Sequence, residues 1–199
     1  MPFQNRVLAT GEIVATPERG LFMGNRGILH DSQKRLGKAR WKHKAWIICV
    51  LKHKDWHREV MTPNNYTELF FLDDAVALSA GHRPCALCRR EDFDAYRTAA
   101  GFNGTAKEMD DALHAARAVP RVFGQRRHSE QISSLPDGTV IDHQGTASLV
   151  FGDTLRPITA GGYLTAIPRP RNGLCEVLTP EPSVEALRNG FVPVMHPSL

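Results

Sequence analysis

Two cysteines separated by two residues, Cys85 and Cys88, constrain the fold of this chain more than any other feature. A tight turn in a Cys-x-x-Cys segment brings both sulfurs to one side, which is half of a tetrahedral zinc site. Arg83, Arg89 and Arg90 flank the pair, and their charge favours the thiolate form that metals require. The pattern therefore predicts a turn fixed by one Zn²⁺ beside a cationic surface.

A tetrahedral site needs two further ligands. Cys49 is the third candidate, because it is a soft donor within the apolar segment 45–51, which reads as a buried strand. His30, which follows a glycine-rich turn, is favoured as the fourth. His53 is the alternative, but in an extended chain it lies roughly 13 Å from Cys49, so that both could bind one ion only across a bend. Further options are His82, His57 and Cys175.

The cysteines also allow readings without a metal. Cys49 can be a small buried apolar residue, as free cysteine often is. Cys85 and Cys88 can form a redox dithiol, although such a pair usually opens a helix after a strand, whereas here it follows a predicted helix end at Gly81. The pair can also be structural without any ion.

Residues 67–90 resemble the second half of the Ada-type metal-binding domain. The shared pattern is an aromatic strand at Phe70-Phe71, a short helix ending at Gly81, and then Arg83-Pro84-Cys85-x-x-Cys88 with basic residues after it. The resemblance implies one zinc held by four cysteines, contact with DNA phosphates, and a zinc thiolate that accepts a methyl group. The family's first pair, Cys-x3-Cys, has a partial match in Cys49-x3-His53. The remainder of the chain is similar to uncharacterised bacterial proteins.

The positive charge of the chain is concentrated in residues 34–58. The whole sequence has a net charge of +4, whereas this segment holds nine Lys or Arg and one acid, Asp55. All three tryptophans lie inside it. Cations displace counterions from phosphates and rings stack on bases, so the segment predicts nucleic-acid contact, against the alternative of a solvated loop with a core tryptophan. The predicted contacts are Lys38, Arg40, Trp41, Lys42, Lys44, Lys54, Trp56, Arg83, Arg89 and Arg90.

Turn signals and periodicity predict an α+β fold. Residues 1–120 are expected to form a zinc-stapled part with short strands, a return strand at 58–61 and helices near 73–80, 91–100 and 106–119. Residues 121–134 are expected to be a linker and 135–199 a β-rich part, unless the chain forms one continuous domain. No apolar run reaches the length of a membrane span or a signal core, so we expect a cytoplasmic protein. In that reducing compartment, the four cysteines are expected to be metal ligands or packed thiols rather than two disulfides.

The sequence also contains candidate catalytic groups. His114 with two acids on a predicted helix, and Asp142 beside His143, are candidate acid–base groups, although a helix surface and a turn explain them as well. No complete hydrolase, metalloprotease, phosphate-loop or deaminase motif is present. The sequence thus favours a zinc-containing protein that binds nucleic acid, with DNA preferred, in repair or damage sensing. The alternatives are a nucleic-acid-processing hydrolase and a protein-interaction module with a structural zinc.

Overall fold

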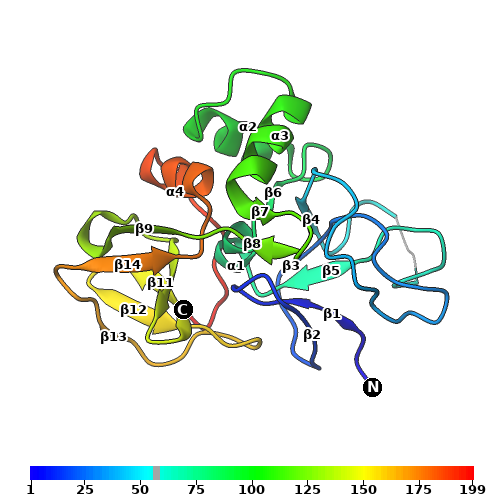
Figure 1. Ribbon diagram of the computed structural model, residues 1–199, viewed down its shortest axis with the longest axis horizontal. Coiled ribbons are helices and arrows are strands. Elements are labelled where there is room, and N and C mark those ends of the chain that lie inside the picture. Colours follow the sequence, from blue (N-terminus) through cyan, green and yellow to red (C-terminus); the bar gives the residue numbers. More distant parts are fainter. Residues whose placement is uncertain (56–58) are drawn as a thin grey trace.

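The computed structural model describes residues 1–55 and 59–199 and has an α+β fold (Figure 1). Its amino-terminal sheet has the strand order β2-β1-β5-β3-β4-β6, with parallel pairing of β1 with β5 and of β4 with β6. Those two parallel pairs bring together segments that are far apart in the sequence. The strands are β1 (Gln4–Val7), β2 (Ile13–Ala15), β3 (Phe22–Asn25), β4 (Ile47–Val50), β5 (Leu69–Phe71) and β6 (Arg83–Pro84).

A second sheet belongs mainly to the carboxy-terminal part and has the order β13-β12-β11-β10-β14-β9. Its pairs are antiparallel, and the tight turn between β10 and β11 places Gln144 and Gly145 at positive φ, as expected for a two-residue hairpin. A short ribbon pairs β7 (Ala118–Val119) with β8 (Gly124–Gln125). The strands of the second sheet are β9 (His128–Gln131), β10 (Val140–His143), β11 (Thr146–Phe151), β12 (Thr154–Pro157), β13 (Ile167–Pro168) and β14 (Leu174–Val177).

The helices predicted from periodicity and caps are present. α1 (Asp74–Ser79) begins where the Asp73 carboxylate accepts a hydrogen bond from the Val76 N–H at 3.0 Å. α3 (Ala106–Arg117) begins with a capping box between Thr105 and Glu108. The other helices of the described residues are α2 (Arg90–Ala99), α4 (Glu181–Arg188) and the 3-10 turn η1 (Ile132–Ser134).

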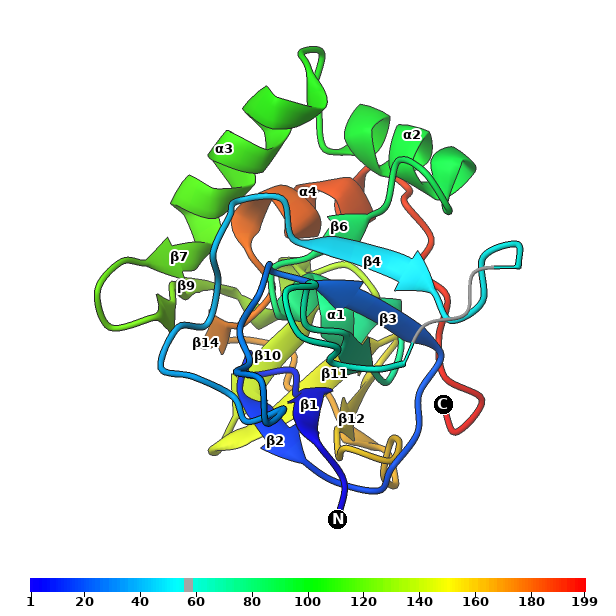
Figure 2. The ribbon, with the colours of Figure 1, turned by 90° about the vertical axis from the view of Figure 1, so that its right-hand side faces the viewer.

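Helix α1 lies between the two sheets and is buried along its whole length (Figure 2). One hydrophobic cluster joins Val76 of α1 to Val140 and Leu149 of the second sheet, and another joins Tyr96 of α2 to Phe191 after α4. Residues 121–134, where we expected a linker, contain β8, β9 and η1, because β9 pairs with β14 as a sheet edge. The two parts of the chain therefore share their cores.

A buried hydrogen bond also ties the two parts together. The Tyr163 hydroxyl donates to an Asp73 oxygen at 2.6 Å, and burial is the main reason why the pKa of Asp73 lies above its usual value. We expect Tyr163→Phe to lower the free energy of unfolding by about 1.5–3 kcal/mol, since it leaves a buried carboxylate short of one donor. Urea denaturation of the variant and of the parent chain measures this loss. A loss below about 0.5 kcal/mol would contradict the assignment.

Two predicted details differ from the structure. The described part of the predicted return strand, 59–61, is not a strand, and the rest of that prediction lies outside the described residues. Within the predicted β-rich part, residues 162–167 form only a bridge between Ile158 and Tyr163 and the first residue of β13. None of the helices among the described residues has the length and apolar character needed to cross a bilayer.

Candidate metal centre

Strand pairing places Cys49 beside Cys85. Cys49 lies on β4 and faces Met23 of β3 in the antiparallel register. The parallel pairing of β4 with β6 then sets Ile48 against Pro84, and the Cys85 N–H donates to the Ile48 carbonyl oxygen at 2.9 Å. Because Cys49 and Cys85 each come one residue after these partners, their side chains meet at the end of β6.

A turn between β6 and α2 brings Cys88 to the same point. The Leu87 N–H donates to the Cys85 sulfur at 3.4 Å, and the Arg89 N–H donates to the Cys85 carbonyl oxygen at 3.1 Å. The sulfur atoms of Cys49, Cys85 and Cys88 all lie within 4.8 Å of one another. The predicted grouping of these three cysteines is confirmed, and three soft donors at this spacing can hold one metal ion.

The three thiols cannot all ionise on their own. Hydrogen bonding to Cys85 and Cys88, followed by burial, raises the pKa of Cys49 far above its usual value. Hydrogen bonding from Cys49 and Cys88, together with nearby N–H groups, lowers the pKa of Cys85. The cluster therefore favours a thiolate at Cys85, and a bound cation would supply the charge needed to hold the other two as thiolates.

The cysteines border a cavity of about 550 Å³. His53, the alternative fourth ligand, lines this cavity, although its nitrogens lie outside the three-sulfur group. Glu68 lines it as well, is 5% exposed, and accepts a hydrogen bond from the Met61 N–H at 2.7 Å. A metal held by the three sulfurs would thus face a space that already contains an imidazole and a carboxylate.

The favoured fourth ligand, His30, is placed elsewhere. Its ring nitrogens lie 2.6 Å from the Thr67 hydroxyl and 3.2 Å from the Thr62 carbonyl oxygen, so both are hydrogen-bonded away from the sulfurs. His82 is also engaged, because its Nε2 accepts from Arg26 at 3.1 Å. Cys175 lies on β14 of the second sheet, and His57 is outside the described residues. Among the predicted ligands that the structure describes, only His53 stands beside the three cysteines.

Two of the three arginines near the pair are structural. The Arg83 guanidinium donates twice to Asp110 at 2.9 and 2.8 Å, and the Arg89 guanidinium donates twice to Asp74 at 2.5 and 2.8 Å. Both arginines are buried, so neither presents its charge to a phosphate, contrary to our prediction. A buried guanidinium requires a partner, and a carboxylate of the fold is already that partner. Arg90 is exposed and pairs with Asp94 at 2.8 Å.

The other predicted nucleic-acid contacts fall into two groups. Lys38, Lys42 and Lys54 are exposed and make no ion pair with any described residue. Lys44 forms an ion pair with Asp111 at 2.6 Å. The Arg40 guanidinium donates to the carbonyl oxygens of Gly37, Lys38 and Ala39. Trp56 lies outside the described residues.

Trp41 packs against other rings rather than standing alone. Its ring centroid lies 5.3 Å from that of Trp46, 5.5 Å from that of His114 and 4.9 Å from that of Phe123. Trp46, which belongs to the apolar segment 45–51, is 3% exposed and is therefore a core tryptophan. The guanidinium carbons of Arg26 and Arg117 lie 4.2 and 4.1 Å from its centroid. Burial lowers the pKa of each arginine to about 9, and the ring provides an electron-rich surface for them.

The structure does not gather the candidate catalytic residues. His114 packs on Trp41 and Trp46, while the neighbouring Asp110 and Asp111 are bound to Arg83 and to lysines. Asp142 accepts from the Gly145 N–H at 2.7 Å in the turn after β10, with His143 beside it. These groups therefore do not line the cavity at the cysteines.

Glu68 is the site residue that the sequence analysis missed. An acid directly before the apolar run Leu69-Phe70-Phe71 is a usable signal, because a charged residue at a buried strand usually has a specific partner. Comparison with family models, with curated proteins and with solved structures finds no match to this chain.

Proposed function

We propose that this chain is a zinc-thiolate protein that binds nucleic acid, with DNA as the preferred ligand. Zinc is the metal that best suits three cysteines when a fourth position is available to a histidine or to water. The partial Ada-type resemblance of residues 67–90 points to the same metal. The single observation that carries the proposal is that exposed lysines and the three sulfurs border one hollowed surface.

The hollowed surface consists of two adjoining spaces. The cavity at the cysteines shares Asn25 and Tyr66 with a larger hollow of about 1070 Å³ that Lys38 and Lys42 line. Phe123 and Tyr66 add rings to the walls of that hollow. Lysines that make no ion pair among the described residues are available to phosphates, and rings nearby can stack on bases.

The proposal is tested by binding of labelled duplex and single-stranded oligonucleotides at several salt concentrations. Affinity should fall linearly in log salt, and the double change Lys38→Gln with Lys42→Gln should reduce the slope by about one for each lysine. Lys107→Gln is the matched control, because Lys107 is an exposed lysine on α3 that is paired with Asp111. Binding with no salt dependence, or an unchanged slope in the double variant, would contradict the proposal.

A second candidate is a zinc-dependent hydrolase acting on nucleic acid. The observation that favours it is Glu68, which lines the same cavity as the three cysteines and could move a proton beside a metal-bound water. The same oligonucleotides, analysed for cleavage or base release, separate the two candidates. Turnover that is lost in Glu68→Gln, with metal content retained, would favour the enzyme over the binding protein.

A further inference from the structure

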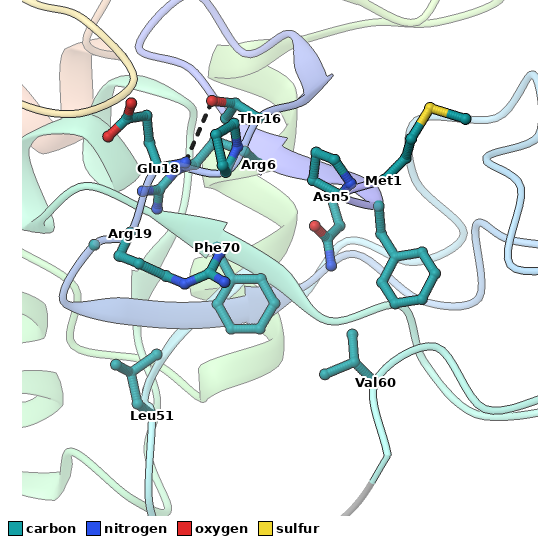
Figure 3. A pocket seen from close by; sticks show the side chains of 13 residues that line it. Met1, Asn5, Arg6, Thr16, Glu18, Arg19, Leu51, Val60 and Phe70 are labelled. Atoms are coloured by element: carbon teal, nitrogen blue, oxygen red, sulfur yellow. Dashed lines mark hydrogen bonds between the residues drawn. The ribbon is translucent and has the colours of Figure 1, made fainter.

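A third hollow, a cavity of about 620 Å³, lies between the first strand and the turn at residues 16–20. Arg6 and Asn5 of β1, Arg19 of the turn and Phe70 of β5 are among the residues that line it. Figure 3 shows the Asn5 amide extending from β1 into this space, with Arg19 and Phe70 on another side of it. Two arginines and one asparagine are therefore among the residues that line the cavity.

Arg6 is buried without a partner. Its exposed fraction is 3%, and its Nε, Nη1 and Nη2 atoms have no hydrogen-bond partner among the described residues. A buried charge of this kind is costly unless another group pairs with it. Gly20 leaves room at the guanidinium, because a Cβ at Gly20 would lie 2.6 Å from the Arg6 Nη1 atom.

The other buried arginines of the described chain all have partners. Arg83 and Arg89 each bind a carboxylate, while Arg26 and Arg117 donate to carbonyl oxygens of the chain between Ser79 and His82. The fold therefore satisfies a guanidinium wherever it buries one, except at Arg6. A missing partner at a cavity wall indicates that the partner comes from outside the chain.

The charge around the cavity selects an anion. Arg19 is exposed and forms no ion pair with the described residues, and its charge adds to that of Arg6. Burial lowers the pKa of Arg6, and the neighbouring charge of Arg19 lowers it further. An anion between the two arginines would raise the pKa of Arg6 again. Glu18 lies nearby but is within ion-pair distance of neither arginine. Two guanidinium forks match the several oxygens of a phosphate better than the two of a carboxylate.

We propose that this cavity binds a phosphate group, held by the guanidinium groups of Arg6 and Arg19 with the Asn5 amide as a further donor. The site is on the sheet face that carries the cysteines, because Leu51, Val60 and Phe70 line both cavities. The sheet register aligns four residues on adjacent strands: Arg6, Phe70, Met23 and Cys49. Because three strand spacings lie between Arg6 and Cys49, these two residues are roughly 14 Å apart. The phosphate can belong to a free ester or to a nucleic-acid backbone, and the site does not require the lysines at 38 and 42.

The test is calorimetric titration of the full chain, in a buffer free of phosphate, with inorganic phosphate, a nucleoside monophosphate and a single-stranded oligonucleotide. Arg6→Met and Arg19→Gln are each expected to weaken binding by about tenfold or more. Arg171→Gln, at an exposed arginine in the loop before β14, is the matched control and should bind as the parent chain does. Arg19→Gln keeps the test valid if Arg6→Met does not fold, because Arg19 is on the surface.

The three probes distinguish the source of the phosphate. Arginine-dependent binding of inorganic phosphate or the monophosphate supports a site for small esters, whereas arginine-dependent binding of the oligonucleotide alone supports a backbone phosphate. The double variant Lys38→Gln with Lys42→Gln distinguishes this site from the nucleic-acid surface of the proposed function. It should leave binding of the monophosphate unaltered, because this site does not use the two lysines. Absence of binding by all three probes, or equal binding by the parent chain and both arginine variants, would overturn the proposal.

Discussion

Replacement of Cys85 by serine is expected to remove the metal from this protein. Three sulfurs within 4.8 Å form the donor group, and a serine hydroxyl is a poor substitute for a thiolate at a soft ion. Elemental analysis of purified protein should find one zinc per chain in the parent, and little in Cys85→Ser, Cys88→Ser and Cys49→Ser. The Cys49 variant is the most informative, because this ligand was predicted from a strand remote from the Cys-x-x-Cys turn.

Two controls belong with this experiment. Cys175→Ser should retain the metal, because Cys175 lies on β14 and its sulfur contacts the Glu130 carbonyl oxygen. His30→Ala should retain it too, whereas His53→Ala should reduce metal affinity if the cavity histidine completes the site. Full metal content in Cys49→Ser would remove that residue from the centre.

Metal removal should also lower stability. A ligand that binds only the folded chain contributes about 2.7 kcal/mol at a concentration one hundred times its dissociation constant. The sulfurs come from β4 and from the turn before α2, so that the ion would join two segments that are more than thirty residues apart. Thermal unfolding with and without a chelator should therefore show a lower midpoint for the chelated parent, and no change for Cys85→Ser.

Local signals predicted the parts of the centre that depend on neighbouring residues. The Asp73 cap, the glycine at position 81 and the Cys-x-x-Cys spacing act over a few residues, and the structure contains the cap, a left-handed Gly81 and the two-cysteine turn. Cys49 was found because a thiol in an apolar strand near an incomplete site is a natural ligand, although the predicted buried strand, β4, is only half-buried at Cys49. The parallel pairing of β4 with β6 that brings it there has no local signature.

The wrong predictions concern partners that are distant in the sequence. His30 suits a metal by its residue type, but Thr67 binds its ring instead, and Thr67 follows it by 37 residues. Arg83 and Arg89 belong to a basic motif, yet their partners are Asp110 and Asp74. A pattern of charge along the chain cannot distinguish an arginine that meets solvent from one that meets a buried carboxylate, because tertiary packing decides the matter.

Removal of one partner from the buried ion pair between Asp74 and Arg89 is expected to lower the stability of the fold strongly. The side chains are 1% and 3% exposed, and the Asp74 carboxylate also accepts from the Val194 N–H at 3.0 Å. Burial alone would lower the pKa of Arg89, but the pair with Asp74 raises it above its usual value. Asp74→Asn should therefore cost about 3–5 kcal/mol in the free energy of unfolding, because it leaves the buried guanidinium of Arg89 paired only with Asp92, whose side chain is 44% exposed.

Urea denaturation measures this cost, and Arg90→Gln provides the matched control. Arg90 is the next residue, but its pair with Asp94 is exposed, so its loss should change the free energy of unfolding by no more than about 0.5 kcal/mol. The double change Asp74→Leu with Arg89→Leu should cost less than the sum of the two single changes, because it leaves no unpaired charge. Since Arg89 directly follows Cys88, Asp74→Asn should also weaken metal binding, which Arg90→Gln should not. A cost below about 1 kcal/mol in Asp74→Asn would mean that water reaches the pair and that the turn at Cys88 is held by other contacts.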